Sequence, residues 1–212
     1  MNRNLLLIGA GGHCASVIDS LKSSSQFDKI GIIVKDNKET MSVSGIEVVG
    51  TDMDLSSLKN QYKYAFITIG SIGNTSVRRI IYTKLLEEGY VLPNIIDKTA
   101  VIADDADIGK GIYFGKNCIV NSRTIIHDCC IINTGVIIEH DCYIDDFAHI
   151  ATGGILCGNV KIGKDTHIGA GAVVKQGISI GDNSMIGIGS IVVFDIRASV
   201  TAFGNPCREH II

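Results

Sequence analysis

The chain has 212 residues, a formal net charge of −3 and a hydrophobic content of 46%. This length suits one or two domains with an ample core, and the lack of a basic run argues against nucleic acid or an anionic membrane surface as a partner. The apolar stretch near the amino terminus is too short for a signal peptide or a membrane span, so we expect a cytoplasmic protein.

The first 93 residues alternate between predicted strands and helices. Short apolar runs at Asn4–Ile8, Lys29–Val34 and Tyr64–Ile69 are typical of buried strands. A helical pattern follows the first run, and a second one spans Gly73–Glu88. This alternation predicts a Rossmann-like α/β domain over residues 1–93, built on a small parallel sheet.

Glycines separate the first strand from the first helix, in the stretch LLLIGAGGHC. Backbone N–H groups at a helix N-terminus favour a phosphate, so Gly11 and Gly12 are candidates for nucleotide binding, with a plain tight turn as the alternative. A dinucleotide fingerprint needs a third glycine where Cys14 stands, which argues against a dehydrogenase. Asp36 is either an acceptor for a ribose hydroxyl or base N–H or a solvated loop acid, and Gly70 lies at the same sheet edge.

The chain repeats every six residues in its second half. Each sixth residue from Ile96 to Val192 is aliphatic or aromatic, and a smaller residue such as Ala148 follows four positions later. A period of six fits neither a helix nor a lone strand. It indicates a β-helix in which three flat faces, 18 residues in all, complete one triangular turn. We expect this all-β domain over residues 94–195 and a tail over residues 196–212.

The repeat constrains where ligands can bind. No insertion interrupts it, so we expect a small-molecule site to need a neighbouring subunit, the first domain, or both. The seven cysteines match no disulfide or zinc spacing. Cys118, Cys130 and Cys142 fall on the small inward position, where cysteine acts as a compact hydrophobe.

Four histidines lie within the repeat. His140 is two residues past an inward isoleucine, so it should lie at an outward corner, between Glu139 and Asp141. A carboxylate that accepts from one ring nitrogen raises the basicity of the other, so His140 is a candidate general base, and either acid can be its partner. We expect His127 and His167 to be solvated turn residues. The spacings lack the close histidine pair that a zinc-dependent β-helix carbonic anhydrase needs, so no metal site is expected.

Five motifs occur in the order GAGGH, FITIG, IIEHDCYIDDFAHI, CGNVKIG and GNPCR. In this order they resemble the bacterial acyltransferases that join a small Rossmann-like domain to a left-handed β-helix. That family includes UDP-4-amino-sugar N-acetyltransferases and sialic acid O-acetyltransferases, and the resemblance covers nearly the whole chain. It implies a homotrimer with active sites at the subunit boundaries and acetyl-CoA as the acyl donor.

The resemblance also implies roles for individual residues. His140 would be the general base, Asp141 would raise its basicity, and Asn133 would help to position the acceptor. The residues implied to contact acetyl-CoA are His149, Gly158, Ala170 and Ile188. The residues implied to bind the nucleotide sugar are Gly11, Gly12, His13, Asp36 and Gly70.

The sequence therefore predicts acetyl transfer from acetyl-CoA to the amino group of a nucleotide-linked amino sugar in surface-glycan synthesis, by direct attack on the thioester. One residue departs from the UDP-4-amino-sugar pattern: Lys35 stands where those enzymes carry an acid, which favours an acceptor other than a uridine nucleotide. The alternatives are O-acetylation of sialic acid and a non-catalytic trimeric nucleotide-binding scaffold. The acids around His140 argue against the scaffold.

Overall fold

The computed structural model describes residues 3–22, 24–35 and 42–210, which form two compact units. The first unit holds the chain up to Ser71 together with Ser76–Ile95. The second holds Ile72–Thr75 and the chain from Ile96 onward. Within the described ranges no helix combines the length and the apolar character that a bilayer span requires.

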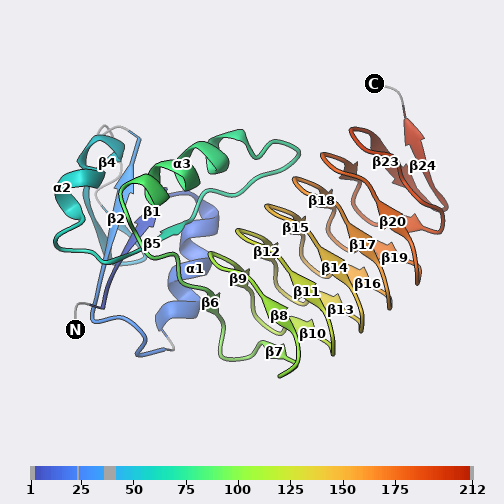
Figure 1. The fold of residues 1–212 in the computed structure, drawn as a ribbon, viewed down its shortest axis with the longest axis horizontal. Helices are drawn as coiled ribbons and strands as arrows, with labels where there is room; N and C mark the ends of the chain where they lie inside the picture. The colour runs from blue at the N-terminus through green and yellow to red at the C-terminus, as the bar shows by residue number, and fades with distance from the viewer. Residues whose placement is uncertain (1–2, 23, 36–41, 211–212) are drawn as a thin grey trace. The chain divides into compact units, whose positions relative to one another are not determined.

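The first unit is built on a five-stranded sheet in the order β3-β4-β2-β1-β5 (Figure 1). β1 pairs in parallel with β2 and β5, β2 pairs in parallel with β4, and β3 is antiparallel to β4. The elements are β1 Asn4–Ile8, α1 Gly12–Lys22, β2 Lys29–Val34, β3 Ser42–Val43, β4 Ile46–Thr51, the 3₁₀ turn η1 Asp52–Asp54, α2 Leu55–Leu58, β5 Tyr64–Ile67 and α3 Ser76–Glu87.

The predicted Rossmann-like unit is confirmed, with differences at its element ends. β5 ends at Ile67, two residues earlier than predicted, and α3 begins at Ser76, because Gly73 adopts a positive φ of 69° that a helix does not allow. The sequence analysis did not predict β4. Its residues are only partly buried, so the strand lacks the apolar run that marks β1 and β2.

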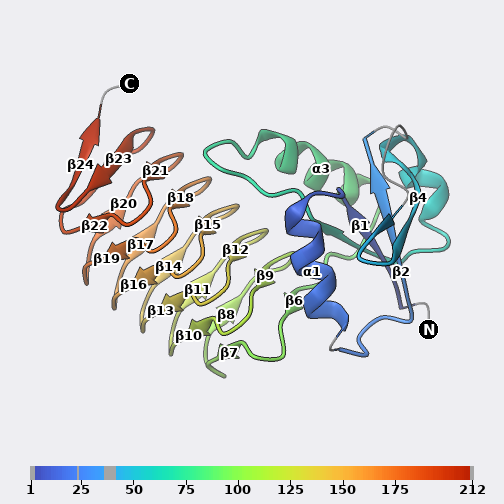
Figure 2. The same cartoon turned by 180° about the vertical axis from the view of Figure 1, so that it is seen from behind.

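The second unit is a parallel β-helix, as predicted, and Figures 1 and 2 show its short strands stacked in successive coils. We call its three sheets face 1 (β6, β9, β12, β15, β18, β21, β23, β24), face 2 (β7, β10, β13, β16, β19, β22) and face 3 (β8, β11, β14, β17, β20). The two-residue strands are β6 Ile95–Ile96, β7 Val101–Ile102, β8 Asp107–Ile108, β9 Tyr113–Phe114, β10 Ile119–Val120, β11 Ile125–Ile126, β12 Ile131–Ile132, β13 Ile137–Ile138, β14 Tyr143–Ile144, β15 His149–Ile150, β16 Ile155–Leu156, β17 Lys161–Ile162, β18 His167–Ile168, β19 Val173–Val174, β20 Ser179–Ile180, β21 Met185–Ile186 and β22 Ile191–Val192.

From β9 onward the second residue of each of these strands is buried in the core, and Ile102 and Ile108 in β7 and β8 are partly buried. β6 is an exception to the predicted inward series, because Ile95 is buried there and Ile96 is 45% exposed. Phe114, Val120 and Ile126, one on each face of a single coil, are at most 1% exposed. Backbone N–H groups donate to the next coil, as from Asn133 N to Ile150 O at 3.0 Å. The six-residue period therefore reports the inward side chains, and residues 18 apart lie side by side on neighbouring coils, about 4.8 Å from each other.

The corners between faces have a fixed backbone form. Each is a turn of four residues whose third member repeatedly adopts a positive φ, as Arg123 (58°) and Asp141 (61°) do. We name the corners by the faces that they join: corner 1–2, corner 2–3 and corner 3–1. Because corners stack like strands do, a side chain at a corner has neighbours at the same position on the coils before and after it.

The six-residue period changes after Val192. Ile196 pairs with Ile180 and Thr201 with Met185, so partners on the last coil are 16 residues apart instead of 18. The predicted tail then continues face 1 through β23 Thr201–Gly204, which pairs antiparallel with β24 Cys207–His210. Figure 2 shows this hairpin at the end of the stack, beside β20–β22.

A pair of adjacent isoleucines tests the inward register. Ile126 is 1% exposed and Ile125, its neighbour in β11, is 38% exposed. Ile126→Asp buries a carboxylate without a partner, which we expect to lower the free energy of unfolding by about 3 kcal/mol or more. Ile125→Asp serves as the matched control and should cost far less. Chemical denaturation of both variants measures the difference, and equal losses would contradict the register.

Candidate active site

His140 lies at corner 2–3 and is half exposed. Its Nδ1 is 2.7 Å from Oδ2 of Asp141. Of the two flanking acids, Asp141 is therefore the one that hydrogen-bonds His140 in this structure. An ionised carboxylate only accepts hydrogen bonds, so Nδ1 carries the proton, and in the neutral ring Nε2 has the free lone pair. His140 is thus arranged to accept a proton through Nε2.

Arg123 lies one coil before Asp141 and holds its carboxylate with two hydrogen bonds. Nε donates to Oδ1 at 2.7 Å and Nη2 donates to Oδ2 at 2.9 Å. Hydrogen bonds from Arg123, and to a smaller extent from His140, lower the pKa of Asp141 to about 2. This carboxylate therefore stays ionised at neutral pH. The sequence analysis missed Arg123, although the 18-residue spacing to Asp141 would have placed the two side by side.

Gly158 lies one coil after His140, buried against its ring. A Cβ built on Gly158 would lie 2.6 Å from Cε1 of His140 and 2.7 Å from Nε2. No side chain fits there without moving the imidazole. The backbone is also tied at this point, since Asn159 N donates to His140 O at 2.9 Å. Gly158, which the resemblance assigns to acetyl-CoA, therefore leaves the space that the imidazole occupies.

A second polar group lies where face 1 meets corner 1–2. Asn133 Oδ1 accepts from Thr134 N at 2.8 Å, which fixes the orientation of the amide and leaves Nδ2 as the donor toward other groups. Nδ2 is 3.4 Å from Nε2 of His149, a buried residue of β15. His149 Nε2 is then the acceptor of this contact.

The structure corrects the expectation that His167 and His127 are solvated. His167 is buried beside His149, with ring centroids 4.7 Å apart, and burial lowers its pKa. Its Nδ1 has no hydrogen-bond partner among the described residues. His127 is partly buried and packs on Tyr143, with centroids 5.0 Å apart. Both rings take part in packing because each contacts an aromatic ring 16 or 18 positions away on a neighbouring coil.

A possible set of metal ligands at corner 3–1 was not anticipated. Ligand atoms of His127, Asp145 and Asp146 lie within 4.8 Å of one another. Each acid already accepts a backbone hydrogen bond: Asp145 from Asp146 N at 2.7 Å and Asp146 from Asp128 N at 3.0 Å. These contacts give the acids a structural role in the corner.

The predicted site residues of the β-helix fall on two different corners of the chain. His140, Asp141 and Gly158 belong to corner 2–3. Asn133 belongs to corner 1–2, as do the exposed residues Ala170 and Ile188 higher in the stack. Face 2 separates the two corners, so one chain does not bring its two groups of residues together.

Face 2 itself is aliphatic on its outer side. Its outward residues stack in register on six successive coils, and they are Val101, Ile119, Ile137, Ile155, Val173 and Ile191. All six are exposed or partly exposed, and Val101 is 60% exposed. Face 3, by contrast, presents Asp107, Lys161 and Ser179 among its outward residues. Face 2 therefore presents a continuous apolar stripe to its surroundings.

In the first unit, the predicted nucleotide-binding residues gather at the N-terminus of α1. Gly11 and Gly12 are exposed, and a Cβ at either would meet nothing within 4 Å. Gly70, which follows β5, lies next to His13, since its built Cβ would be 3.8 Å from that of His13. Gly9 is structural: its φ is +108° and a Cβ would lie 2.6 Å from Ile69. The open helix end is suited to an anion.

The remaining predicted residue of this group is Asp36, which lies outside the described residues. Lys35, just before it, is exposed at the end of β2. Cys14, which stands where a third glycine would be in a dinucleotide fingerprint, is fully buried in α1 together with Val17, Ile18 and Leu21. This spacing gives α1 its apolar side.

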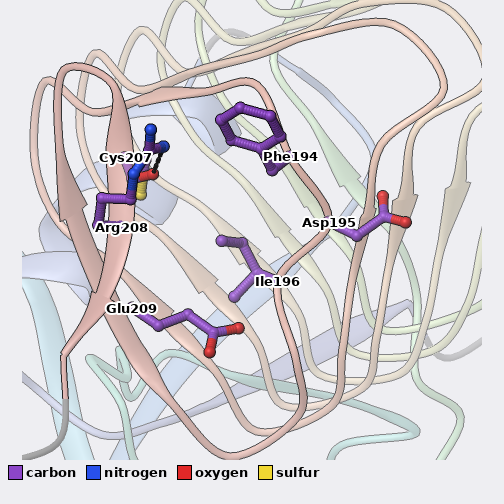
Figure 3. Close-up of a pocket in the computed structure, with 6 residues that line it drawn as sticks. All are labelled: Phe194, Asp195, Ile196, Cys207, Arg208 and Glu209. Carbon is purple, nitrogen blue, oxygen red and sulfur yellow. Dashed lines mark hydrogen bonds between the residues drawn. The ribbon is translucent and has the colours of Figure 1, made fainter.

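The second unit also carries a pocket that the sequence analysis did not predict, of about 370 Å³ at the end of the stack (Figure 3). It is lined by Phe194, Asp195, Ile196, Cys207, Arg208 and Glu209. The Arg208 guanidinium lies 4.8 Å from the centre of the Phe194 ring, and its Nη1 donates to Cys207 O at 3.0 Å. The shortened last coil and the hairpin that folds back on it create this space.

The cysteines take no part in the candidate site. All seven are free thiols. Cys118, Cys130 and Cys142 are at most 1% exposed within the core, as their inward position predicts. Burial raises the pKa of Cys118 to about 12 and that of Cys142 to about 11, so neither offers a thiolate at neutral pH.

The chain resembles known proteins along almost its whole length. The model of the PglD N-terminal domain family matches residues 4–85. A histidine-to-asparagine variant of perosamine N-acetyltransferase from Caulobacter crescentus, solved with CoA and GDP-perosamine, is 31% identical with a TM-score of 0.92, over 99% of this chain and 97% of that one. The acetyltransferase domain of PglB from Neisseria gonorrhoeae, solved with acetyl coenzyme A, is 32% identical with a TM-score of 0.92, over 99% and 100%. WeeI from Acinetobacter baumannii is 26% identical with a TM-score of 0.83, over 97% and 99%.

The contact between Gly158 and His140 can be measured by a double-mutant cycle. Gly158→Ala should lower the free energy of unfolding by about 1 kcal/mol, because the His140 ring must leave its favoured rotamer. In a His140→Ala background the same substitution should cost much less, because nothing occupies the space. Chemical denaturation of the four proteins gives the coupling, and an equal cost in both backgrounds would show that the ring does not lie on Gly158.

Proposed function

Because the chain belongs to the bacterial sugar acetyltransferases that join a Rossmann-like N-terminal domain to a β-helix, we propose that it transfers the acetyl group of acetyl-CoA to the amino group of a nucleotide-linked amino sugar. The observation that carries this proposal is the His140–Asp141 pair at 2.7 Å. An ionised Asp141 on Nδ1 leaves Nε2 as the acceptor that amine acylation requires.

The reaction needs one base and no covalent enzyme intermediate. The amine nitrogen attacks the thioester carbonyl carbon, and His140 Nε2 accepts the proton that the nitrogen loses. The C–S bond then breaks, and His140 returns the proton to the departing thiolate, which leaves as CoA. A thioester is already activated, so alignment of the two substrates supplies much of the rate. Asp141 holds the imidazole and stabilises its protonated form.

The apolar outer side of face 2 supports a homotrimer. In a threefold ring that packs this face around the axis, corner 2–3 of one subunit meets corner 1–2 of the next. His140 of one subunit then lies close to Asn133 and His149 of its neighbour. Burial of the apolar stripe on face 2 would stabilise the trimer. The residues at corner 1–2 and those at corner 2–3, which one chain keeps apart, would then form one site. Acetyl-CoA in this arrangement runs along corner 1–2, past Ala170 and Ile188.

The first unit supplies the site for the nucleotide part of the acceptor. Its phosphates are proposed to bind at the N-terminus of α1, where Gly11 and Gly12 leave open space and backbone N–H groups point outward. His13 and Gly70 form the adjacent wall. A lysine at position 35 adds a cation near the end of β2, where the UDP-4-amino-sugar pattern has an acid, and we propose an acceptor nucleotide other than uridine diphosphate.

A single and a double substitution test the two halves of the site. His140→Ala removes the base and should lower the rate of thiol release from acetyl-CoA about 100-fold, with the thermal unfolding transition little changed. The double substitution of Asn133 and His149 by alanine should lower the rate at subsaturating acetyl-CoA by a comparable factor, because it removes the half of the site at corner 1–2. Near-parental turnover of His140→Ala would exclude this residue as the base.

Co-expression of these two inactive proteins tests the shared site. In a mixed trimer one of the three boundaries combines an intact His140 with an intact Asn133–His149 corner. Equal, random mixing should therefore restore about one quarter of the parental rate. Mixtures of separately purified trimers that cannot exchange subunits are the control and should stay inactive. No recovery on co-expression would mean that each chain forms its site alone or that the assembly differs.

A further inference from the structure

The geometry points to Arg123 as a positioning residue that holds Asp141 and limits how strongly this carboxylate stabilises protonated His140. The inference rests on the proposed function, because it treats His140 as the base. It gives Arg123 a purpose beyond tying two coils together: the arginine shares the carboxylate that contacts His140 and offsets its attraction for a protonated imidazole.

The three side chains share one oxygen atom. Oδ2 of Asp141 accepts from His140 Nδ1 at 2.7 Å and from Arg123 Nη2 at 2.9 Å, while Oδ1 accepts from Arg123 Nε at 2.7 Å. Two parallel hydrogen bonds of this type fix the position of a carboxylate and favour its ionised form. The orientation of Asp141 toward His140 is thus set by Arg123.

Arg123 is itself anchored from the coil before it. Its backbone N donates to Asp105 Oδ1 at 3.3 Å, and Ser122 Oγ donates to Asp105 Oδ2 at 2.6 Å. Its φ of 58° turns the chain at corner 2–3 in the same way as Asp141 does one coil later. A column of three coils, from Asp105 through Arg123 to Asp141, therefore supports the imidazole.

The charges around His140 decide the direction of the effect. Its own coil supplies the acids Glu139 and Asp141, and the coil before it supplies Arg123, with Asp105 one coil further. The coil after it presents Gly158, which has no side chain. Arg123 is the cation of this set, and it hydrogen-bonds the same oxygen as His140. Its positive charge offsets the attraction between Asp141 and an imidazolium, so removal of Arg123 favours protonation of His140.

The size of the effect is limited by solvent, because the side chains of Arg123, His140 and Asp141 are 63%, 49% and 38% exposed. Exposed ion pairs contribute little energy, and we expect a shift of about 0.5 pH unit. NMR titration of the His140 ring in protein labelled at histidine measures it, with His140→Ala identifying the signal. Arg123→Gln should move the titration midpoint of His140 upward, whereas Arg123→Lys, which keeps the cation, should stay closer to the parent.

Arg197→Gln is the matched control. Arg197 forms a comparable exposed pair with Glu209, at 2.8 and 2.6 Å, several coils away from His140, and its loss should leave the midpoint unchanged. An unchanged or lowered midpoint in Arg123→Gln would overturn the inference. The titration needs no turnover, so its result stands apart from the proposed function. In active protein, the acid limb of kcat/KM should move upward with the midpoint in Arg123→Gln alone.

Discussion

Stacking of one large inward side chain at every sixth residue is the constraint on which the rest of the second unit depends. Phe114, Ile132 and Ile150 follow one another on face 1 and are fully buried. Each such side chain contributes about 2 kcal/mol of hydrophobic stabilisation, and the contact repeats from coil to coil. The stacking admits 18 residues a coil, and this number determines the neighbours of every outward side chain.

The chemistry of the site follows from that number. Outward residues that lie 18 apart meet at hydrogen-bond or ring-contact distance, and the pairs at the site are Arg123 with Asp141, His140 with Gly158, and His149 with His167. The flat faces also keep some residues apart, since face 2 separates the residues at corner 1–2 from those at corner 2–3. A rigid prism can orient a base well, and in the proposed trimer a second copy brings the other set of groups to that base. The aliphatic stripe on face 2 fits this arrangement.

Much of the fold could be predicted from the sequence, because the six-residue period has no exception between Ile96 and Val192 and the apolar runs of β1 and β2 are clear. β4 was missed because its residues, none of them fully buried, form no such run. The shortened coil after Val192 was missed because the period gives no information once it stops. In the site, the His140–Asp141 contact was one of two open choices. Arg123 was overlooked because arginine at a corner looks like a solvated charge until the coil spacing is applied. The sequence analysis did not separate the predicted residues onto two corners, because that step requires each strand to be assigned to one of the three faces.

The most direct test of the account is the acetylated product that forms from a panel of acceptors. The purified chain is incubated with acetyl-CoA and, in turn, GDP-linked and UDP-linked 4-amino sugars and free or CMP-linked sialic acids, with mass spectrometry of each acceptor and measurement of released thiol. The account predicts a single N-acetyl group on a nucleotide-linked amino sugar, with one thiol released for each product. O-acetylated sialic acid as the only product, or no thiol release from any acceptor, would contradict it.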